Sequence, residues 1–246
     1  MLSGMTYAVE FQSVSKHYGS LNVLKKVDLA VKAHKTTVVV GESGSGKSTL
    51  LKLINAVVRA DAGKVLYFGQ DITVLDAPKH RRNIGYAVQG AGLFPHLSAR
   101  DNVVLLAKLE NWSGAKIEER FVELADMMNL DQSLNDKYPH QLSGGQCQRF
   151  GLCRAFMLAP AMLLLDEAFS AIDPITRSAI HDQFIALREQ EPITTLMVTH
   201  DMREAVKLGD HLVILRGGLI LQSASVDEVL NSPADSYVSN LLATQL

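Results

Sequence analysis

The sequence lacks the features that mark secreted and membrane-spanning proteins. Its N-terminal segment, MLSGMTYAVE, has neither a basic stretch nor a long apolar core, which argues against a secretory signal. The most apolar runs, 161–165 and 195–198, are far too short to cross a bilayer and are typical of buried strands. We therefore predict neither a signal peptide nor a transmembrane helix.

Cysteine is also scarce, since only Cys147 and Cys153 occur among the 246 residues. In the helix predicted for this stretch, these two side chains point in different directions and cannot form a local disulfide. No cluster of cysteine and histidine has the spacing of a zinc site. This cysteine usage is typical of a protein of the reducing cytoplasm.

An excess of positive charge is absent as well, because 24 Lys and Arg residues face 26 Asp and Glu residues. Bulk attraction to nucleic acid is therefore not indicated, and we predict no nucleic-acid partner. Hydrophobic residues make up 47 % of the chain and charged residues 20 %, with no internal repeat and no low-complexity linker. This composition predicts a globular chain, long enough for one large α/β domain or two small ones.

Hydrophobic periodicity predicts alternating strands and helices. The clearest segment joins a β-branched strand, 36–40, through a glycine-rich loop to a helix with apolar residues between 49 and 58. Further strands are predicted at 7–11, 24–31, 83–89, 162–165 and 194–199, with a hairpin at 211–222. Further helical segments are predicted at 99–138, 146–158, 175–189, 203–208, 226–230 and 237–242.

The glycine-rich loop carries the strongest chemical signal, because residues 41–49, GESGSGKST, match the pattern G-x-x-x-x-G-K-[ST] between a strand and a helix. Glycines let the backbone N–H groups point inward at phosphate oxygens, and the helix N-terminus adds its positive end. Lys47 is predicted to reach the β- and γ-phosphates, and the Ser48 hydroxyl to bind Mg²⁺. The loop predicts ATP and Mg²⁺ as ligands. The predicted nucleotide-binding residues in it are Gly41, Ser43, Gly44, Ser45, Gly46, Lys47, Ser48 and Thr49.

Two adjacent carboxylates, Asp166 and Glu167, end the buried strand 162–165. Asp166 is predicted to orient Mg²⁺, and Glu167 to polarise the attacking water as a general base. Solvated acids at an ordinary strand end are the alternative, but the phosphate loop elsewhere in the chain favours the catalytic interpretation.

The motif LSGGQ at residues 142–146 is the most specific feature of the chain. Ser143 can cap the helix that follows, and Gly144 and Gly145 expose backbone N–H groups at its positive end, beside Gln146. The motif resembles the signature of the ABC ATPases, although a plain N-capped helix is the simpler structural interpretation. In that family the signature faces the γ-phosphate held by a second subunit. The resemblance therefore implies a head-to-tail dimer, here expected to be a homodimer, with Ser143 to Gln146 acting in trans.

The resemblance extends over most of the chain and implies both fold and further roles. It implies a P-loop NTPase (RecA-like) core with an N-terminal antiparallel β subdomain and an α-helical subdomain. Residues 1–246 would form one nucleotide-binding domain, with the helical subdomain inserted at about 92–158 and no C-terminal regulatory domain. The implied roles are adenine stacking for Tyr18, Mg²⁺ binding for Gln89 and a D-loop at Asp173, and His200 is implied as a catalytic switch histidine on the γ-phosphate. A Tyr in a turn and a strand-end His also have ordinary structural roles.

Departures from the family pattern fall near the catalytic residues. Ala168 replaces the usual proline after Glu167, which is expected to loosen that loop while activity survives. Ile172 replaces a leucine, and Gly151 inside the signature helix costs about 1 kcal/mol relative to alanine. A bulky reagent on Cys147 is hypothesised to block dimer closure, whereas a small space-filling role is the alternative.

Three stretches, 84–96, 173–177 and 199–210, resemble the ATPases of bacterial importers for osmoprotectants such as glycine betaine, choline and carnitine. This resemblance implies permease subunits as partners, a solute-binding protein as an indirect one, and a peripheral position on the cytoplasmic face of the bacterial inner membrane. Another small solute or lipid trafficking is the alternative within transport. DNA-repair and ribosomal relatives fit less well, because the segment 89–142 is too short for a coiled coil and the chain has one domain. A lone P-loop kinase would not need LSGGQ.

The apolar loop 92–97 has two interpretations. Leu93 and Phe94 could be exposed anchors for the coupling helix of a membrane subunit. They could equally pack inside the helical subdomain.

Overall fold

The structure is a computed structural model that describes residues 6–88, 90–190 and 193–246. The chain divides into two compact units. The first unit comprises Met1–Arg81 and Ile193–Leu246, and the second comprises Arg82–Pro192. Across the described ranges, no helix has the length and apolar character needed to cross a membrane.

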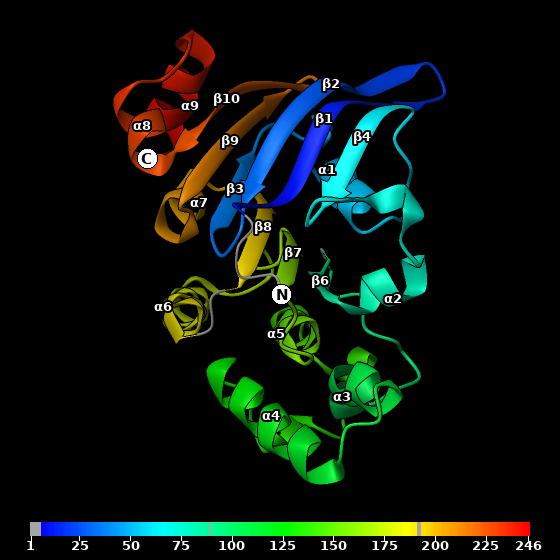
Figure 1. Cartoon of the computed structure of the whole chain (residues 1–246). Coiled ribbons are helices and arrows are strands. Elements are labelled where there is room, and N and C mark those ends of the chain that lie inside the picture. The colour runs from blue at the N-terminus through cyan, green and yellow to red at the C-terminus, as the bar shows by residue number, and fades with distance from the viewer. Residues whose placement is uncertain (1–5, 89, 191–192) are drawn as a thin grey trace. The chain divides into compact units, whose positions relative to one another are not determined.

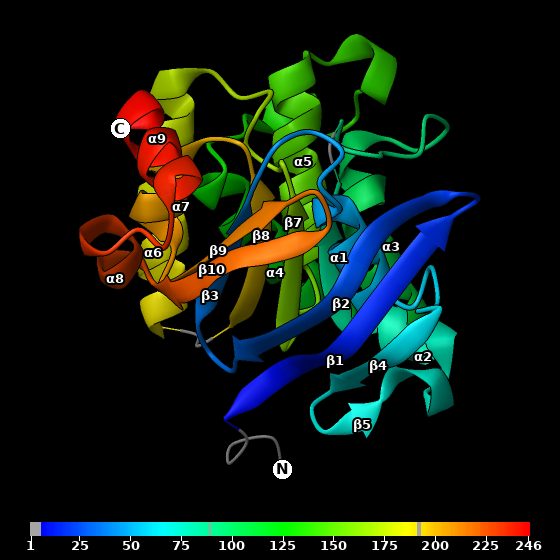
Figure 2. The same ribbon diagram turned by 90° about the horizontal axis from the view of Figure 1, so that it is seen from above.

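An antiparallel sheet in the order β2-β1-β4-β5 forms one layer of the first unit (Figure 2). It consists of β1 (Tyr7–Tyr18), β2 (Leu21–Lys32), β4 (Ala62–Tyr67) and β5 (Gln70–Asp71). β1 pairs with β2 through Glu10 opposite Ala30, and with β4 through Glu10 opposite Leu66. The predicted turn after Tyr18 therefore connects two long strands, and the antiparallel β subdomain expected at the N-terminus is present.

The second sheet region of the first unit holds the strand that leads into the phosphate loop. β3 (Thr36–Val40) lies parallel between β8 (Thr194–Thr199) and β9 (His211–Arg216), and β10 (Leu219–Ser225) pairs antiparallel with β9. Every residue of β3 and β8 is buried, as expected for β-branched strands covered on both faces. The helices of this unit are α1 (Lys47–Ile54), α2 (Ala77–Arg82, at the boundary), α7 (Met202–Leu208), α8 (Val226–Asn231) and α9 (Ser236–Gln245).

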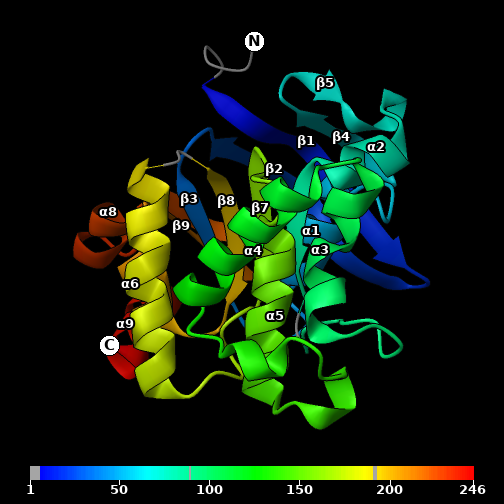
Figure 3. The same ribbon diagram turned by 90° about the horizontal axis from the view of Figure 1, so that it is seen from below.

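The second unit pairs a short parallel ribbon with helices. β6 (Ile84–Ala87) lies parallel to β7 (Met162–Asp166), with Gly85 opposite Leu163. The helices are α3 (Ala99–Leu109), α4 (Gly114–Met127), α5 (Gly144–Phe156) and α6 (Pro174–Gln190), and Figures 1 and 3 show α3, α4 and α5 packed together. Large fully buried side chains fill its core, among them Phe121, Phe150, Phe156 and Phe169.

The continuous helical pattern predicted over 99–138 is wrong in one respect, since the chain breaks into α3 and α4 with short 3-10 turns beyond. Asn111 adopts a left-handed φ of 56°, and Ser113 caps α4 through its side chain. The insertion of a helical subdomain at about 92–158 stays a prediction, as does the single-domain organisation. That range falls within the second unit.

Candidate nucleotide-binding site

The phosphate loop joins β3 to α1 and is shaped by neighbours that leave no room for side chains. A Cβ at Gly41 would overlap the carbonyl oxygen of Leu215. Gly46 has a φ of 107°, and a Cβ there would lie 2.7 Å from Leu24 Cδ2. Gly44 also has a positive φ, 78°. Glycines at 44 and 46 are therefore needed for the backbone turn itself, as the sequence pattern predicts.

Lys47 lies inside this loop rather than in solvent. Its Nζ donates hydrogen bonds of 2.8 Å to the carbonyl oxygens of both Gly41 and Glu42. Ser45 is buried in the same loop, and no described residue accepts or donates a hydrogen bond at its hydroxyl oxygen. A cation turned inward and an unsatisfied buried hydroxyl fit a loop that binds an anion.

The start of α1 also differs from the starts of α3, α4 and α5. Gly46 is its N-cap and offers no side chain, whereas Ser98, Ser113 and Ser143 cap α3, α4 and α5 through their hydroxyls. The positive end of α1 is thus left without a side-chain cap at the place where the motif predicts phosphate.

Two further predicted residues belong to the first unit. Tyr18 ends β1 with 45 % of its surface exposed, and the Nζ of Lys16 lies 5.5 Å from its ring centroid. His200 follows β8 and is exposed, between Thr199 and Asp201. The Asp201 amide donates to Thr199 Oγ1 at 3.1 Å, and the Asp201 carboxylate caps α7. Both positions are compatible with the predicted roles, which stay predictions.

Asp166 is the last residue of β7 in the second unit, and Glu167 follows it. Glu167 has a left-handed φ of 49°, an uncommon backbone conformation for a glutamate. Ala168 is 1 % exposed, and its carbonyl accepts a 2.7 Å hydrogen bond from Gln148 Nε2 of α5. Phe169 is buried beside the His181 ring, with centroids 4.8 Å apart. The loop expected to be loosened by the missing proline is thus restrained by a side chain of the signature helix.

The signature motif forms the N-terminus of α5, where Ser143 is the cap that the sequence predicts. Gln146 N donates to Ser143 Oγ at 3.2 Å, and Ser143 N donates to Gln146 Oε1 at 2.8 Å. A Cβ at Gly145 would lie 3.1 Å from the carbonyl oxygen of Ala171, but a Cβ at Gly144 would meet no atom within 4 Å. Asp173, the predicted D-loop residue, accepts a hydrogen bond from Thr176 N, which lowers the pKa of its carboxyl group.

Gln89 lies outside the described residues, but the segment after it is held by α5. A Cβ at Gly151 would lie 3.0 Å from the carbonyl oxygen of Ala91. Arg154 donates hydrogen bonds of 3.0 Å and 2.8 Å to the carbonyls of Ala91 and Gly92. Gly151, which sequence reasoning treats only as a helix penalty, therefore has a packing reason. Its partner lies far away along the chain, so no local pattern indicates it.

The loop that follows, 92–97, has an exposed aromatic residue. Phe94 is 45 % exposed and Leu93 is partly exposed, which favours the exposed interpretation for Phe94. The loop is held by Asn102, a fully buried residue that sequence reasoning missed. Asn102 Oδ1 accepts from Phe94 N at 2.7 Å, and Asn102 Nδ2 donates to the carbonyls of Phe94, Leu97 and Ser98.

Both cysteines of the chain lie on the signature helix. Cys147 and Cys153 both lie on α5 without forming a disulfide. Cys147 is half-buried, and its Sγ lies 3.5 Å from the carbonyl oxygen of Pro139. No group of three or more His, Cys, Asp or Glu residues forms a metal site among the described residues. The Mg²⁺ roles expected for Ser48 and Asp166 stay predictions.

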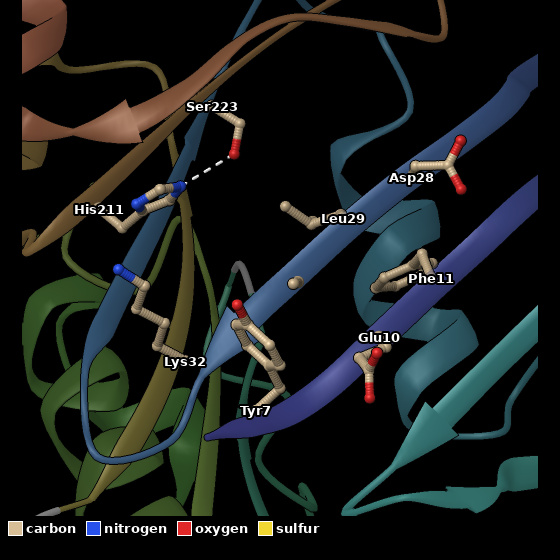
Figure 4. Close-up of a pocket in the computed structure, with 9 residues that line it drawn as sticks. Tyr7, Glu10, Phe11, Asp28, Leu29, Lys32, His211 and Ser223 are labelled. Atoms are coloured by element: carbon tan, nitrogen blue, oxygen red, sulfur yellow. Dashed lines mark hydrogen bonds between the residues drawn. The ribbon is translucent and has the colours of Figure 1, made fainter.

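A groove of about 380 Å³ lies elsewhere in the first unit (Figure 4). His211 Nε2 lies 2.9 Å from Ser223 Oγ, and Lys32 of β2 also lines the groove (Figure 4). Burial first, and then Lys32, lower the pKa of His211, while Glu228 opposes them. None of the predicted nucleotide-binding residues lines this groove.

The loop between β3 and α1, the capped LSGGQ helix and the acids after β7 together define a P-loop ATPase of the ABC class. Residues 24–170 match the family model described as ABC transporter, and the chain belongs to this family. It is 40 % identical over 230 residues to the glycine betaine uptake system ATP-binding protein YehX of Escherichia coli (strain K12). That match covers 94 % of this chain and 75 % of YehX.

A second relative and a solved structure agree with this family. The carnitine transport ATP-binding protein OpuCA of Listeria monocytogenes is 40 % identical over 235 residues, and this chain spans 59 % of its length. The dimeric post-hydrolysis structure of the ATP-binding cassette MJ0796, bound to ADP and Pi, superposes with a TM-score of 0.82 at 30 % identity. That match covers 89 % of this chain and 98 % of MJ0796, which confirms the predicted fold class.

Proposed function

We propose that this chain is the ATP-hydrolysing subunit of an importer for quaternary amines of the glycine betaine, carnitine and choline type. The main observation behind this proposal is that the chain holds the phosphate loop and the LSGGQ motif and is 40 % identical to ATP-binding proteins of glycine betaine and carnitine transport. The solute itself would meet the permease and a binding protein, whereas this subunit would supply the free energy of ATP hydrolysis.

Nucleotide binding is assigned to the first unit. Backbone N–H groups of the loop 41–49 would surround the phosphates, and Tyr18 would stack on the adenine. Lys47 would exchange its bonds to the Gly41 and Glu42 carbonyls for the β- and γ-phosphates. Because its Nζ is already held inside the loop, little side-chain freedom remains to be lost on binding.

Hydrolysis is assigned to a set of metal-binding residues and to two catalytic residues. Ser48, Gln89 and Asp166 would hold Mg²⁺, which neutralises charge on the phosphates when bound. Glu167 would accept the proton of the attacking water, and His200 would contact the γ-phosphate. The left-handed backbone of Glu167 and the bond from Gln148 to Ala168 would keep the carboxylate in position.

The exposed end of α5 supports a site completed by a second copy. No described residue would lie within 4 Å of a Cβ at Gly144, so packing among these residues does not require a glycine there. An absent side chain, a capped helix start and exposed N–H groups suit the close approach of a phosphate from outside. We therefore assign Ser143, Gly144, Gly145 and Gln146 to the ATP of a partner subunit in a head-to-tail homodimer, with Asp173 at the same interface.

The membrane partner is assigned to the loop around Phe94. An exposed aromatic ring on a loop clamped by Asn102 presents a fixed apolar anchor. The subunit would then lie on the cytoplasmic face of the bacterial inner membrane, bound to permease subunits. ATP-driven closure of the dimer would move the permease between its inward- and outward-facing states.

Two measurements test the proposal. Replacing Glu167 by Gln should retain ATP binding while turnover falls by about two orders of magnitude or more, since general-base catalysis contributes roughly 10²–10⁴-fold. The exposed acid Asp182 on α6, changed to Asn, is the matched control.

For the solute, cells lacking osmoprotectant uptake would receive the chain with the permease and binding protein encoded beside it. Labelled glycine betaine, carnitine or choline should then accumulate with the wild-type chain and not with Glu167→Gln. Uptake of a different solute only would overturn the substrate class and leave the ATPase assignment standing.

A further inference from the structure

Helix α9 (Ser236–Gln245) contacts two loops of the first unit that carry predicted nucleotide-site residues. Its first turn lies by Glu42 of the phosphate loop, through Arg216 of β9. Its last turn lies on the start of α7, just beyond His200. Ten helical residues span about 15 Å, so one short rigid element reaches both places.

The contact at the first turn is formed by an aromatic ring and an ion pair. The guanidinium of Arg216 lies 4.0 Å from the ring centroid of Tyr237, and its Nε lies 3.8 Å from Glu42 Oε1. Burial, followed by the facing carboxylate of Glu42, raises the pKa of Tyr237. Glu42 therefore interacts with both Arg216 and Tyr237, while its own carbonyl accepts the hydrogen bond from Lys47.

The contact at the last turn consists of hydrogen bonds. Gln245 Oε1 accepts from the backbone N–H of Met202 at 3.2 Å, and the Gln245 carbonyl accepts from Arg203 Nε at 3.2 Å. Met202 is fully buried and begins α7, two residues after His200. The chain between β8 and α7 is thus held on one side by Thr199 and on the other by α9.

The polar contacts of α9 are not needed to attach this helix to the unit. Val238 and Leu242, one helical turn apart, are the buried residues of α9 and attach it to the unit. Arg216 and Glu42 are each more than half exposed, and such ion pairs add little to global stability. Their effect is expected to be local, on the position of the loops that they join.

We propose that α9 positions the two sides of the nucleotide site in the first unit, with Tyr237 acting on the phosphate loop and Gln245 on the segment after His200. Both are positioning residues, since neither is assigned to nucleotide contact. The inference rests on the proposed ATPase function and adds to it a separate control of binding and of turnover.

The experiment separates these two effects in the whole chain. A fluorescent ATP analogue gives Kd, and steady-state hydrolysis gives kcat. Tyr237→Ala should raise Kd about two- to fivefold with kcat nearly unchanged, as loss of a partly exposed cation–π contact predicts. Gln245→Ala should lower kcat roughly three- to tenfold with Kd unchanged, as loss of one hydrogen bond predicts.

Two further variants distinguish positioning from a merely structural role. Gln245→Glu keeps the acceptor oxygen for Met202 N and should restore kcat. Asn240→Ala changes an exposed side chain between the two ends of α9 and should match the wild type.

Wild-type values of Kd and kcat in all variants would overturn the inference. A rise in Kd together with a fall in kcat in every variant, including Asn240→Ala, would overturn it as well. Absence of hydrolysis by the wild type would instead count against the proposed function, and the Kd of Tyr237→Ala would still decide the role of Tyr237.

Discussion

The hydrogen bond from Gln148 to Ala168 gives a sharp test of how the catalytic loop is held. The variant Gln148→Leu removes the amide while keeping a side chain of similar length. Gln148 and Ala168 are each about 1 % exposed, so water cannot replace the 2.7 Å bond to the Ala168 carbonyl.

The magnitude follows from two opposing effects. An unsatisfied buried carbonyl costs roughly 1–3 kcal/mol. Leucine also removes Gln148 Oε1, a buried oxygen with no hydrogen bond among the described residues, and this offsets part of the loss. We expect the free energy of unfolding to fall by about 1–2 kcal/mol, and kcat to fall about fivefold or more as Glu167 loses its fixed position. KM for ATP should change little, because the phosphate loop belongs to the other unit.

Urea unfolding followed by circular dichroism measures the first quantity, and steady-state ATP hydrolysis measures the second. Gln183→Leu, the same substitution at an exposed position of α6, serves as the control. If Gln148→Leu and Gln183→Leu share the same unfolding free energy and the same kcat, the bond neither stabilises the unit nor positions the loop.

Three further predictions test other parts of the molecule. Gly144→Ala should leave the thermal midpoint unchanged or slightly raised, because its Cβ meets no described residue within 4 Å, while ATPase activity falls at least tenfold. Full activity would remove Gly144 from a phosphate site. Phe94→Ala should abolish co-purification with the permease and leave the ATP Kd unchanged, and intact co-purification would refute the anchor. In the folded protein, burial lowers the pKa of His211 below its ordinary value of 6.5. As the pH falls through that range, the unfolded chain binds a proton at His211 more readily than the folded chain does, so the free energy of unfolding decreases. His211→Gln should therefore lose less unfolding free energy than the wild type between pH 7.5 and 5.5, as measured by urea titration, and equal losses would contradict this.

The sequence predicts those parts of the site whose conformation depends on residues close together in the chain. Gly44 and Gly46 need a positive φ within their own loop, and Ser143 and Gln146 cap each other across three residues. Strand 36–40 is recognisable because five β-branched residues follow one another in the sequence, and all five are buried in the structure. In each case the residues that interact are neighbours in the chain, so their pattern can be recognised in the sequence.

The parts that the sequence does not predict depend on contacts between distant segments. Asn102, Gln148 and Gly151 each serve a loop elsewhere in the fold, and each taken alone is an ordinary helical residue. The restraint on the loop at Ala168 comes in the same way from another element, through Gln148 of α5. Only the folded backbone brings these partners together.

Helix α5 begins with the signature motif and also contacts the loop at Ala168 and the segment at Ala91. Gly144, Gln148 and Gly151 recur at spacings of four and three residues, which puts them on one face of the helix. Gly144 lies at the exposed start of the signature helix, Gln148 donates to the carbonyl of Ala168, and Gly151 packs against Ala91. Substitutions along this face should therefore be non-additive, because each shifts the same helix. In directed evolution, changes at one of these positions would be expected to require compensation at another, which limits how independently catalysis and coupling can be altered.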